Sequence, residues 1–76
     1  MEYRIRIRNL REDNDKTQQE IAEYLGTSQT MYARYERGAN EMPIRHLMNL
    51  ARYYNVDMNY ICGLSSRKKP FPSPNK

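Results

Sequence analysis

Residues 17–38 read TQQEIAEYLGTSQTMYARYERG, and this stretch predicts two short helices joined by a tight turn. Thr17 followed three residues later by Glu20 has the spacing of a capping box, which starts the first helix. Gly26 supplies the left-handed conformation that ends this helix. Ser28 then caps the second helix. The stretch therefore specifies the position of two helices and the turn between them.

The flanking sequence predicts three further helices, so we expect an all-α fold: one compact five-helix bundle over residues 1–64. The expected helices cover about 3–12, 18–25 and 29–37. A fourth has Pro43 in its first turn and extends to Tyr54, and Asp57 caps a short last helix that ends near Gly63. Residues at helical spacing should face the core: Tyr3, Ile7, Leu10, Ile21, Ala22, Leu25, Tyr32, Tyr35, Ile44, Leu47, Leu50, Ala51, Tyr54, Val56, Tyr60 and Ile61. We expect exposed side chains at Tyr24, Tyr53 and His46.

Length and residue usage exclude several classes of protein. Seventy-six residues make one domain with a core near the lower size limit for unaided folding. The single cysteine, Cys62, excludes an internal disulfide framework and fits a reducing compartment. One histidine and one cysteine give no metal-ligand cluster. The charged N-terminal stretch MEYRIRIRNLRED predicts neither a signal peptide nor a membrane segment, so we expect a soluble, cytoplasmic protein without metal or cofactor.

The positive charge is concentrated at one end of the sequence. The net charge is +4, but residues 1–66 hold nine basic and nine acidic side chains. The excess lies at Arg67, Lys68, Lys69 and Lys76, in the segment SSRKKPFPSPNK. This segment, residues 65–76, lacks apolar periodicity and contains three prolines, so we expect a disordered basic tail. A nucleic-acid partner must therefore be argued from local charge placement rather than from the net charge alone.

The stretch from Arg6 to Leu64 resembles the phage repressor and Cro-like helix-turn-helix family of bacterial and phage regulators. The resemblance rests on RIRNLRED, TQQEIAEYLGTS, RYERG, MPIRHLMNLARYYNV and DMNYICG taken together. It implies a lambda-repressor-like DNA-binding domain whose second motif helix lies in the major groove. Two residues depart from the family pattern: Thr27 and Tyr32 stand where aliphatic residues are usual. Tyr32 must then find a partner for its hydroxyl.

The resemblance also implies roles for individual residues. Gln18 matches a position that contacts a DNA phosphate. Arg11 and Glu36 match a buried structural ion pair between the first and third helices. The base-reading positions of the recognition helix fall on Gln29, Thr30 and Arg34.

The chemistry of the recognition-helix residues supports base contacts and leaves alternatives open. Arginine pairs bidentately with guanine, and glutamine with adenine, so Arg34 and Gln29 are candidates. Each is otherwise a phosphate contact or a solvated side chain. Ala33 either touches a thymine methyl or is small so that the helix lies deep in the groove. Arg37 and Arg45 are candidates for phosphate contacts.

We therefore expect a sequence-specific regulator of transcription, a repressor, that binds double-stranded DNA and is not an enzyme. A single recognition helix reads few base pairs, which favours a homodimer on a palindromic operator. The dimer interface should lie around the last helix, at Met58, Ile61 and Leu64. The sequence indicates no small-molecule ligand. The alternative is a protein-binding adaptor or antitoxin-type module of the same fold. An RNA-binding role is disfavoured because Tyr32, Tyr35, Tyr54 and Tyr60 fall on core stripes rather than forming an exposed aromatic face.

Overall fold

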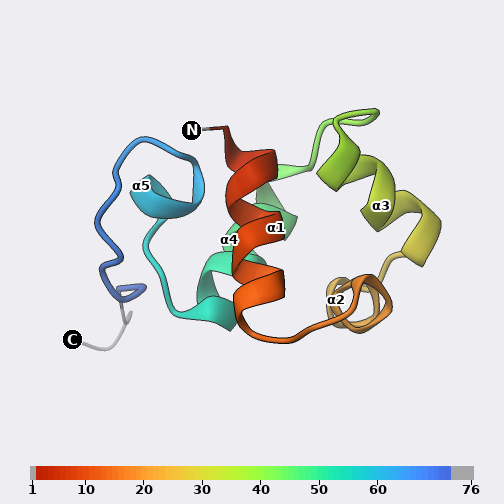
Figure 1. The fold of residues 1–76 in the computed structure, drawn as a ribbon, viewed down its shortest axis with the longest axis horizontal. Helices are drawn as coiled ribbons and strands as arrows, with labels where there is room; N and C mark the ends of the chain where they lie inside the picture. Colours follow the sequence, from red (N-terminus) through yellow and green to blue (C-terminus); the bar gives the residue numbers. More distant parts are fainter. Residues whose placement is uncertain (1, 73–76) are drawn as a thin grey trace.

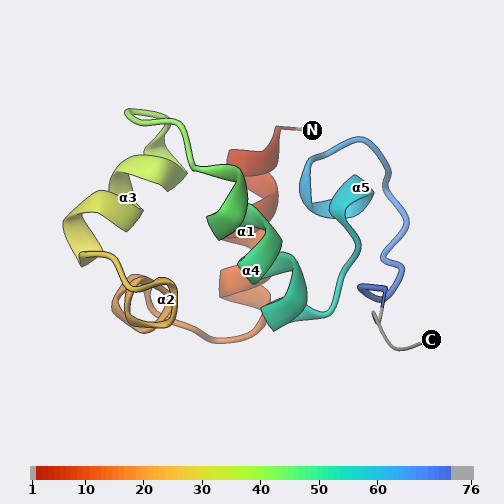
Figure 2. The same ribbon diagram turned by 180° about the vertical axis from the view of Figure 1, so that it is seen from behind.

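The computed structural model describes residues 2–72, and five α-helices account for its regular structure. They are α1 (Tyr3–Asp13), α2 (Gln18–Leu25), α3 (Gln29–Arg37), α4 (Ile44–Tyr54) and α5 (Met58–Ile61). Figures 1 and 2 show α1 and α4 crossing at the centre, with α2 and α3 at one end and α5 at the other. The expected all-α, five-helix fold is confirmed. Within residues 2–72, no helix is long and apolar enough to span a membrane.

The two motif helices begin and end where the sequence predicts. Thr17 Oγ1 accepts a hydrogen bond from Glu20 N at 3.0 Å, and Glu20 Oε1 accepts one from Thr17 N at 2.8 Å. This reciprocal pair is the capping box. Gly26 ends α2 with a φ of 74°, a left-handed conformation that strains other residues. Ser28 Oγ accepts from Met31 N at 3.1 Å and caps α3.

The core lies where α1, α2, α3, α4 and α5 meet. Its buried apolar residues are Ile7, Leu10, Ile21, Ala22, Leu25, Tyr32, Tyr35, Met42, Leu47, Leu50, Ala51, Val56 and Ile61. The predicted core residues Tyr3, Tyr54 and Tyr60 are partly buried against this cluster. Because Ile61 is 0% exposed in the protomer, it cannot form part of a dimer interface as we expected. Leu64 is 79% exposed and remains available.

The start of α4 corrects three expectations. Ile44, expected in the core, is 62% exposed, whereas His46, expected at the surface, is 7% exposed. The two residues flank the apolar stripe of α4 on opposite sides. The His46 flank is covered from α3, where the Tyr35 ring lies 6.0 Å from the imidazole centroid. Pro43 also lies one position before α4, as its N-cap, rather than within the first turn.

Residues 65–72, here called the strap, differ from the disorder that their composition predicts. The strap folds back on the α4–α5 corner: Lys69 O accepts a hydrogen bond from Asp57 N at 2.8 Å, and Asn55 Oδ1 accepts one from Phe71 N at 3.1 Å. Phe71 packs against the core, with the Arg52 guanidinium 5.1 Å from its ring centroid. One aromatic side chain and two hydrogen bonds, one to a backbone group and one to the Asn55 side chain, thus anchor a segment without apolar periodicity. The rest of the expected tail, 73–76, lies outside the described residues.

Tyr60 connects α1, α5 and the strap. The Arg6 guanidinium of α1 lies 4.0 Å from the Tyr60 ring centroid, and the Lys68 ammonium of the strap lies 5.9 Å from it. Both are within the range of cation–π attraction. Arg6 is only 7% exposed, because its stem is covered in reaching this ring. The sequence pattern alone assigned no role to Arg6.

Replacing Phe71 by alanine should loosen the strap. We expect Phe71→Ala to lower the free energy of unfolding by about 1–2 kcal/mol, because a partly buried ring and its cation–π contact are lost. Amide hydrogen exchange at Asp57, whose N–H bonds to the strap, should become faster. Ser66→Ala, at an exposed strap position, is the matched control. Unchanged exchange at Asp57 in Phe71→Ala would show that this anchor does not hold the strap in solution.

Candidate nucleic-acid interface

The outer face of α3 carries the residues expected to read bases. Gln29, Thr30 and Arg34 are exposed, and Ala33 is partly buried. They occupy relative positions i, i+1, i+4 and i+5, which share one side of a helix. The opposite side of α3 is held in the core by Tyr32 and Tyr35. Packing of the buried side therefore fixes α3 in place with its polar side exposed to solvent.

Arg34 is held by a residue that the sequence analysis did not single out. Its Nε donates a hydrogen bond to Asn40 Oδ1 at 2.7 Å, and its carbonyl oxygen accepts from Ala39 N at 2.9 Å. The Nε contact leaves the two terminal guanidinium nitrogens of Arg34 for a ligand. The sequence gives little to identify Asn40 in advance, except that it lies two residues after Gly38, the left-handed residue that ends α3.

Arg11 and Glu36, the pair implied by the family resemblance, lie in direct contact. Arg11 Nε is 2.8 Å from Glu36 Oε2, and Arg11 Nη2 is 3.1 Å from Glu36 Oε1. The third donor, Arg11 Nη1, bonds to Lys16 O at 3.0 Å. The two side chains are 13% and 5% exposed, respectively. This bidentate pair links α1 to the end of α3. Together with the bond to Lys16 O, it gives each guanidinium nitrogen of Arg11 a partner within the fold.

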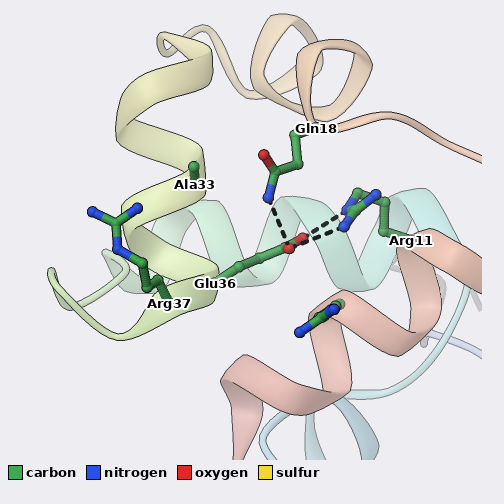
Figure 3. A pocket seen from close by; sticks show the side chains of 6 residues that line it. Arg11, Gln18, Ala33, Glu36 and Arg37 are labelled. Carbon is green, nitrogen blue, oxygen red and sulfur yellow. Dashed lines mark hydrogen bonds and ion pairs between the residues drawn. The ribbon is translucent and has the colours of Figure 1, made fainter.

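Gln18 is engaged within the protein rather than pointing freely to solvent. Its Nε2 donates to Glu36 Oε1 at 3.1 Å, so one of its two amide hydrogens is already used. Figure 3 shows Gln18 and Arg11 converging on the Glu36 carboxylate from α2 and α1. Burial opposes ionisation of Glu36, but the hydrogen bonds from Arg11 and Gln18 outweigh it and hold the pKa of this carboxyl below its ordinary value.

Tyr32 lies beneath this network, and its hydroxyl remains without a hydrogen-bond partner among the described residues. The side chain is 0% exposed. Burial, and then the neighbouring Glu36 carboxylate, raise the pKa of Tyr32 above its ordinary value. The sequence analysis expected this hydroxyl to have a hydrogen-bond partner. Glu36 lies beside it, but no hydrogen bond of normal geometry joins the two among the described residues.

A surface hollow of about 380 Å³ opens between α1, α2 and α3. It is lined by Arg8, Arg11, Gln18, Ala33, Glu36 and Arg37. The fold thus brings Gln18 and Arg37, two expected phosphate contacts, to one place beside the recognition face. Arg45, the third, is exposed on α4 and does not line the hollow. Arg8, which the sequence analysis did not single out, does.

Comparison with known proteins agrees with this arrangement. The family described as "Helix-turn-helix" matches residues 7–61, from the first half of α1 to the end of α5. The chain belongs to the helix-turn-helix family. The match covers most of α1 and all of α2 to α5, so the resemblance to phage repressor and Cro-like proteins extends through the fold and is not confined to the two motif helices.

Several curated relatives are similar to this helix-turn-helix chain over most of its length. YobD of Bacillus subtilis, named an uncharacterized HTH-type transcriptional regulator, is 35% identical over 90% of this chain and 61% of its own. The cryptic phage CTXphi transcriptional repressor RstR of Vibrio cholerae is 30% identical over 83% of this chain and 56% of its own. The chain therefore spans about three fifths of the length of the relatives it matches. No solved structure matches the chain significantly.

Proposed function

We propose that this helix-turn-helix protein is a sequence-specific, double-stranded DNA-binding regulator of transcription that acts as a repressor. The observation that carries the proposal is the exposed polar face of α3, with Arg34 held at its edge and the opposite face buried. A helix with one exposed polar face and one buried face fits the major groove. The names of the reported relatives, a transcriptional regulator and a phage repressor, support the same role. The proposal places the protein in the cytoplasm and assigns it no catalytic step.

The base-contacting set follows from the chemistry of the exposed face. The free guanidinium end of Arg34 is suited to guanine O6 and N7, and the amide of Gln29 to adenine N6 and N7. Thr30 has a hydroxyl that bonds to either base type and a methyl group that packs against thymine. Ala33 lets α3 approach the groove floor closely and places a methyl there.

The phosphate-contacting set lies beside this face. Arg37 is exposed at the end of α3, and Arg45 is exposed in the first turn of α4. Gln18 has one amide hydrogen left for a phosphate, because the other bonds to Glu36. The backbone amides at the start of α2 add a favourable dipole for an anion.

A homodimer on a palindromic operator would give this small reading surface adequate specificity. Two copies related by a two-fold axis place their recognition helices about one helical turn of DNA apart, roughly 34–36 Å. In each protomer, Met58 is partly buried and Leu64 is largely exposed near α5. These residues support a second copy docking at that end of the molecule.

Selection from a pool of random-sequence DNA duplexes tests the proposal. We expect enrichment of one site with two-fold symmetry, whose half-sites lie about one helical turn apart. Enrichment of a single asymmetric half-site bound by one copy would contradict the dimer while leaving DNA binding intact. Recovery of no preferred sequence would contradict the proposed function and favour the protein-binding alternative.

A further inference from the structure

The hollow between α1 and α3 contains more positive charge than the fold uses. Three arginines line it. Each of the three guanidinium nitrogens of Arg11 makes a hydrogen bond within the fold, to Glu36 or to Lys16 O. Arg8 and Arg37 are not engaged in this way, so their charges remain available for a ligand.

Arg37 has no salt-bridge partner in the part of the chain that the structure describes. Figure 3 shows its side chain reaching away from the Glu36 carboxylate, although the two residues are neighbours in sequence. Among the described residues, the Arg8 side chain bonds only to Glu12, with Arg8 Nε 3.2 Å from Glu12 Oε2, and the two side chains are 63% and 51% exposed. Surface ion pairs of this kind are weak, so a phosphate can replace Glu12 as the partner of Arg8.

The acidic residue in the hollow does not cancel these charges. Both Glu36 oxygens already accept hydrogen bonds, from Arg11 and Gln18. The short side chain of Ala33 leaves the hollow open on the α3 side. Its volume of about 380 Å³ leaves room for a group much larger than a single water molecule.

We propose that Arg8 on α1 and Arg37 on α3 together bind one phosphodiester group of the DNA backbone. The inference rests on the proposed function and adds α1 to the surface that contacts DNA. Guanidinium groups match phosphate oxygens in geometry and charge, and two of them from different helices hold one phosphate in a defined position. Arg11, Glu36 and Gln18 act as positioning residues that fix the separation of α1, α2 and α3 around this site.

The salt dependence of binding distinguishes a shared phosphate from two separate ones. With a random-sequence duplex, Arg8→Gln and Arg37→Gln should each weaken binding by roughly 5- to 20-fold at low salt. In the double variant, the slope of log affinity against log salt should fall by about 0.9, the value for one phosphate. A fall of about 1.8 would place the two arginines on different phosphates and overturn the shared site.

A duplex obtained from the selection, with single phosphates replaced in turn by neutral methylphosphonate, locates the contact. At one position the replacement should lower the affinity of the wild-type protein for the duplex. On that modified duplex, Arg8→Gln or Arg37→Gln should cause little further loss of affinity. Arg67→Gln is the charge-matched control, because the strap lies at the opposite end of the molecule from α3 (Figures 1 and 2). If Arg8→Gln behaves like this control while the wild-type protein binds DNA, the shared site is wrong and the proposed function stands.

Two further readouts complete the test. Arg8 and Arg37 are exposed, so both variants should melt at the wild-type temperature, and a large decrease would overturn a purely ligand-binding role. Inorganic phosphate alone should shift the NMR signals of the two guanidinium groups only weakly compared with a duplex. A strong response to inorganic phosphate, combined with no affinity for any duplex, would overturn both the phosphodiester assignment and the proposed function.

Discussion

Glu36→Gln should lower the free energy of unfolding by about 2–4 kcal/mol, because it leaves the largely buried Arg11 guanidinium without its counter-charge. For a domain of this size, the melting temperature should fall by roughly 10–25 °C. The glutamine side chain keeps the shape and some hydrogen bonds of Glu36, so the fold should be retained. Thermal unfolding followed by circular dichroism measures the change.

Two further variants separate the ion pair from a general effect of charge. Glu23→Gln removes an exposed acid of α2 that accepts a hydrogen bond from Gln19 Nε2 at 2.8 Å, and it should change stability by less than about 0.5 kcal/mol. Arg11→Met combined with Glu36→Leu removes both charges and should destabilise less than the two single changes added together. Equal melting temperatures for Glu36→Gln and Glu23→Gln would show that the pair contributes nothing to stability.

The same pair predicts a loss of stability in acid. The pKa of Glu36 is lower in the folded protein than in the unfolded chain, where it is about 4.3. The stabilising contribution is therefore present above the unfolded pKa and is lost as the pH falls through the folded pKa. Wild-type stability should decrease below about pH 4.3 more steeply than that of Glu36→Gln. Parallel pH profiles for the two proteins would contradict this assignment.

Arg34→Ala should have the largest effect on recognition. We expect a loss of about 1–3 kcal/mol on the selected site, which is roughly 5- to 150-fold in affinity, and a relaxed preference at one base pair of each half-site. Arg37→Ala should instead weaken binding evenly across sequences, because a phosphate contact carries no base information. Repeating the selection with each variant measures both effects. An equal loss on all duplexes for Arg34→Ala would make Arg34 a phosphate contact.

Asn40 supplies a more sensitive version of this test. Asn40→Ala removes the 2.7 Å bond that restrains Arg34 Nε but leaves the arginine in place. We expect a smaller loss of affinity than for Arg34→Ala, at the same base pair, because the freed side chain loses more entropy on binding. In an Arg34→Ala background, Asn40→Ala should have no further effect on specificity. A change at a different base pair would mean that Asn40 contacts DNA itself.

The two motif helices could be predicted from the sequence, because the groups that start and end them are close along the chain. The capping box of Thr17 and Glu20, the Ser28 cap and Gly26 act within four residues of their partners, so the bounds of α2 and α3 are readable without the fold. Helical spacing likewise identified most of the core. The pairing of Arg11 with Glu36, 25 residues apart, came from the family resemblance and not from a local pattern.

Tertiary structure alone decided the features that depend on which element lies against which. Helical spacing predicted Ile44 in the core and His46 at the surface, but the position of α3 means that His46 is covered and Ile44 is not. The strap docks because Asp57, Asn55 and Arg52 offer partners that its own composition does not reveal. Arg8 joins the hollow because α1 crosses beside α3. Burial and charge at such sites depend on residues distant in sequence, which no local pattern contains.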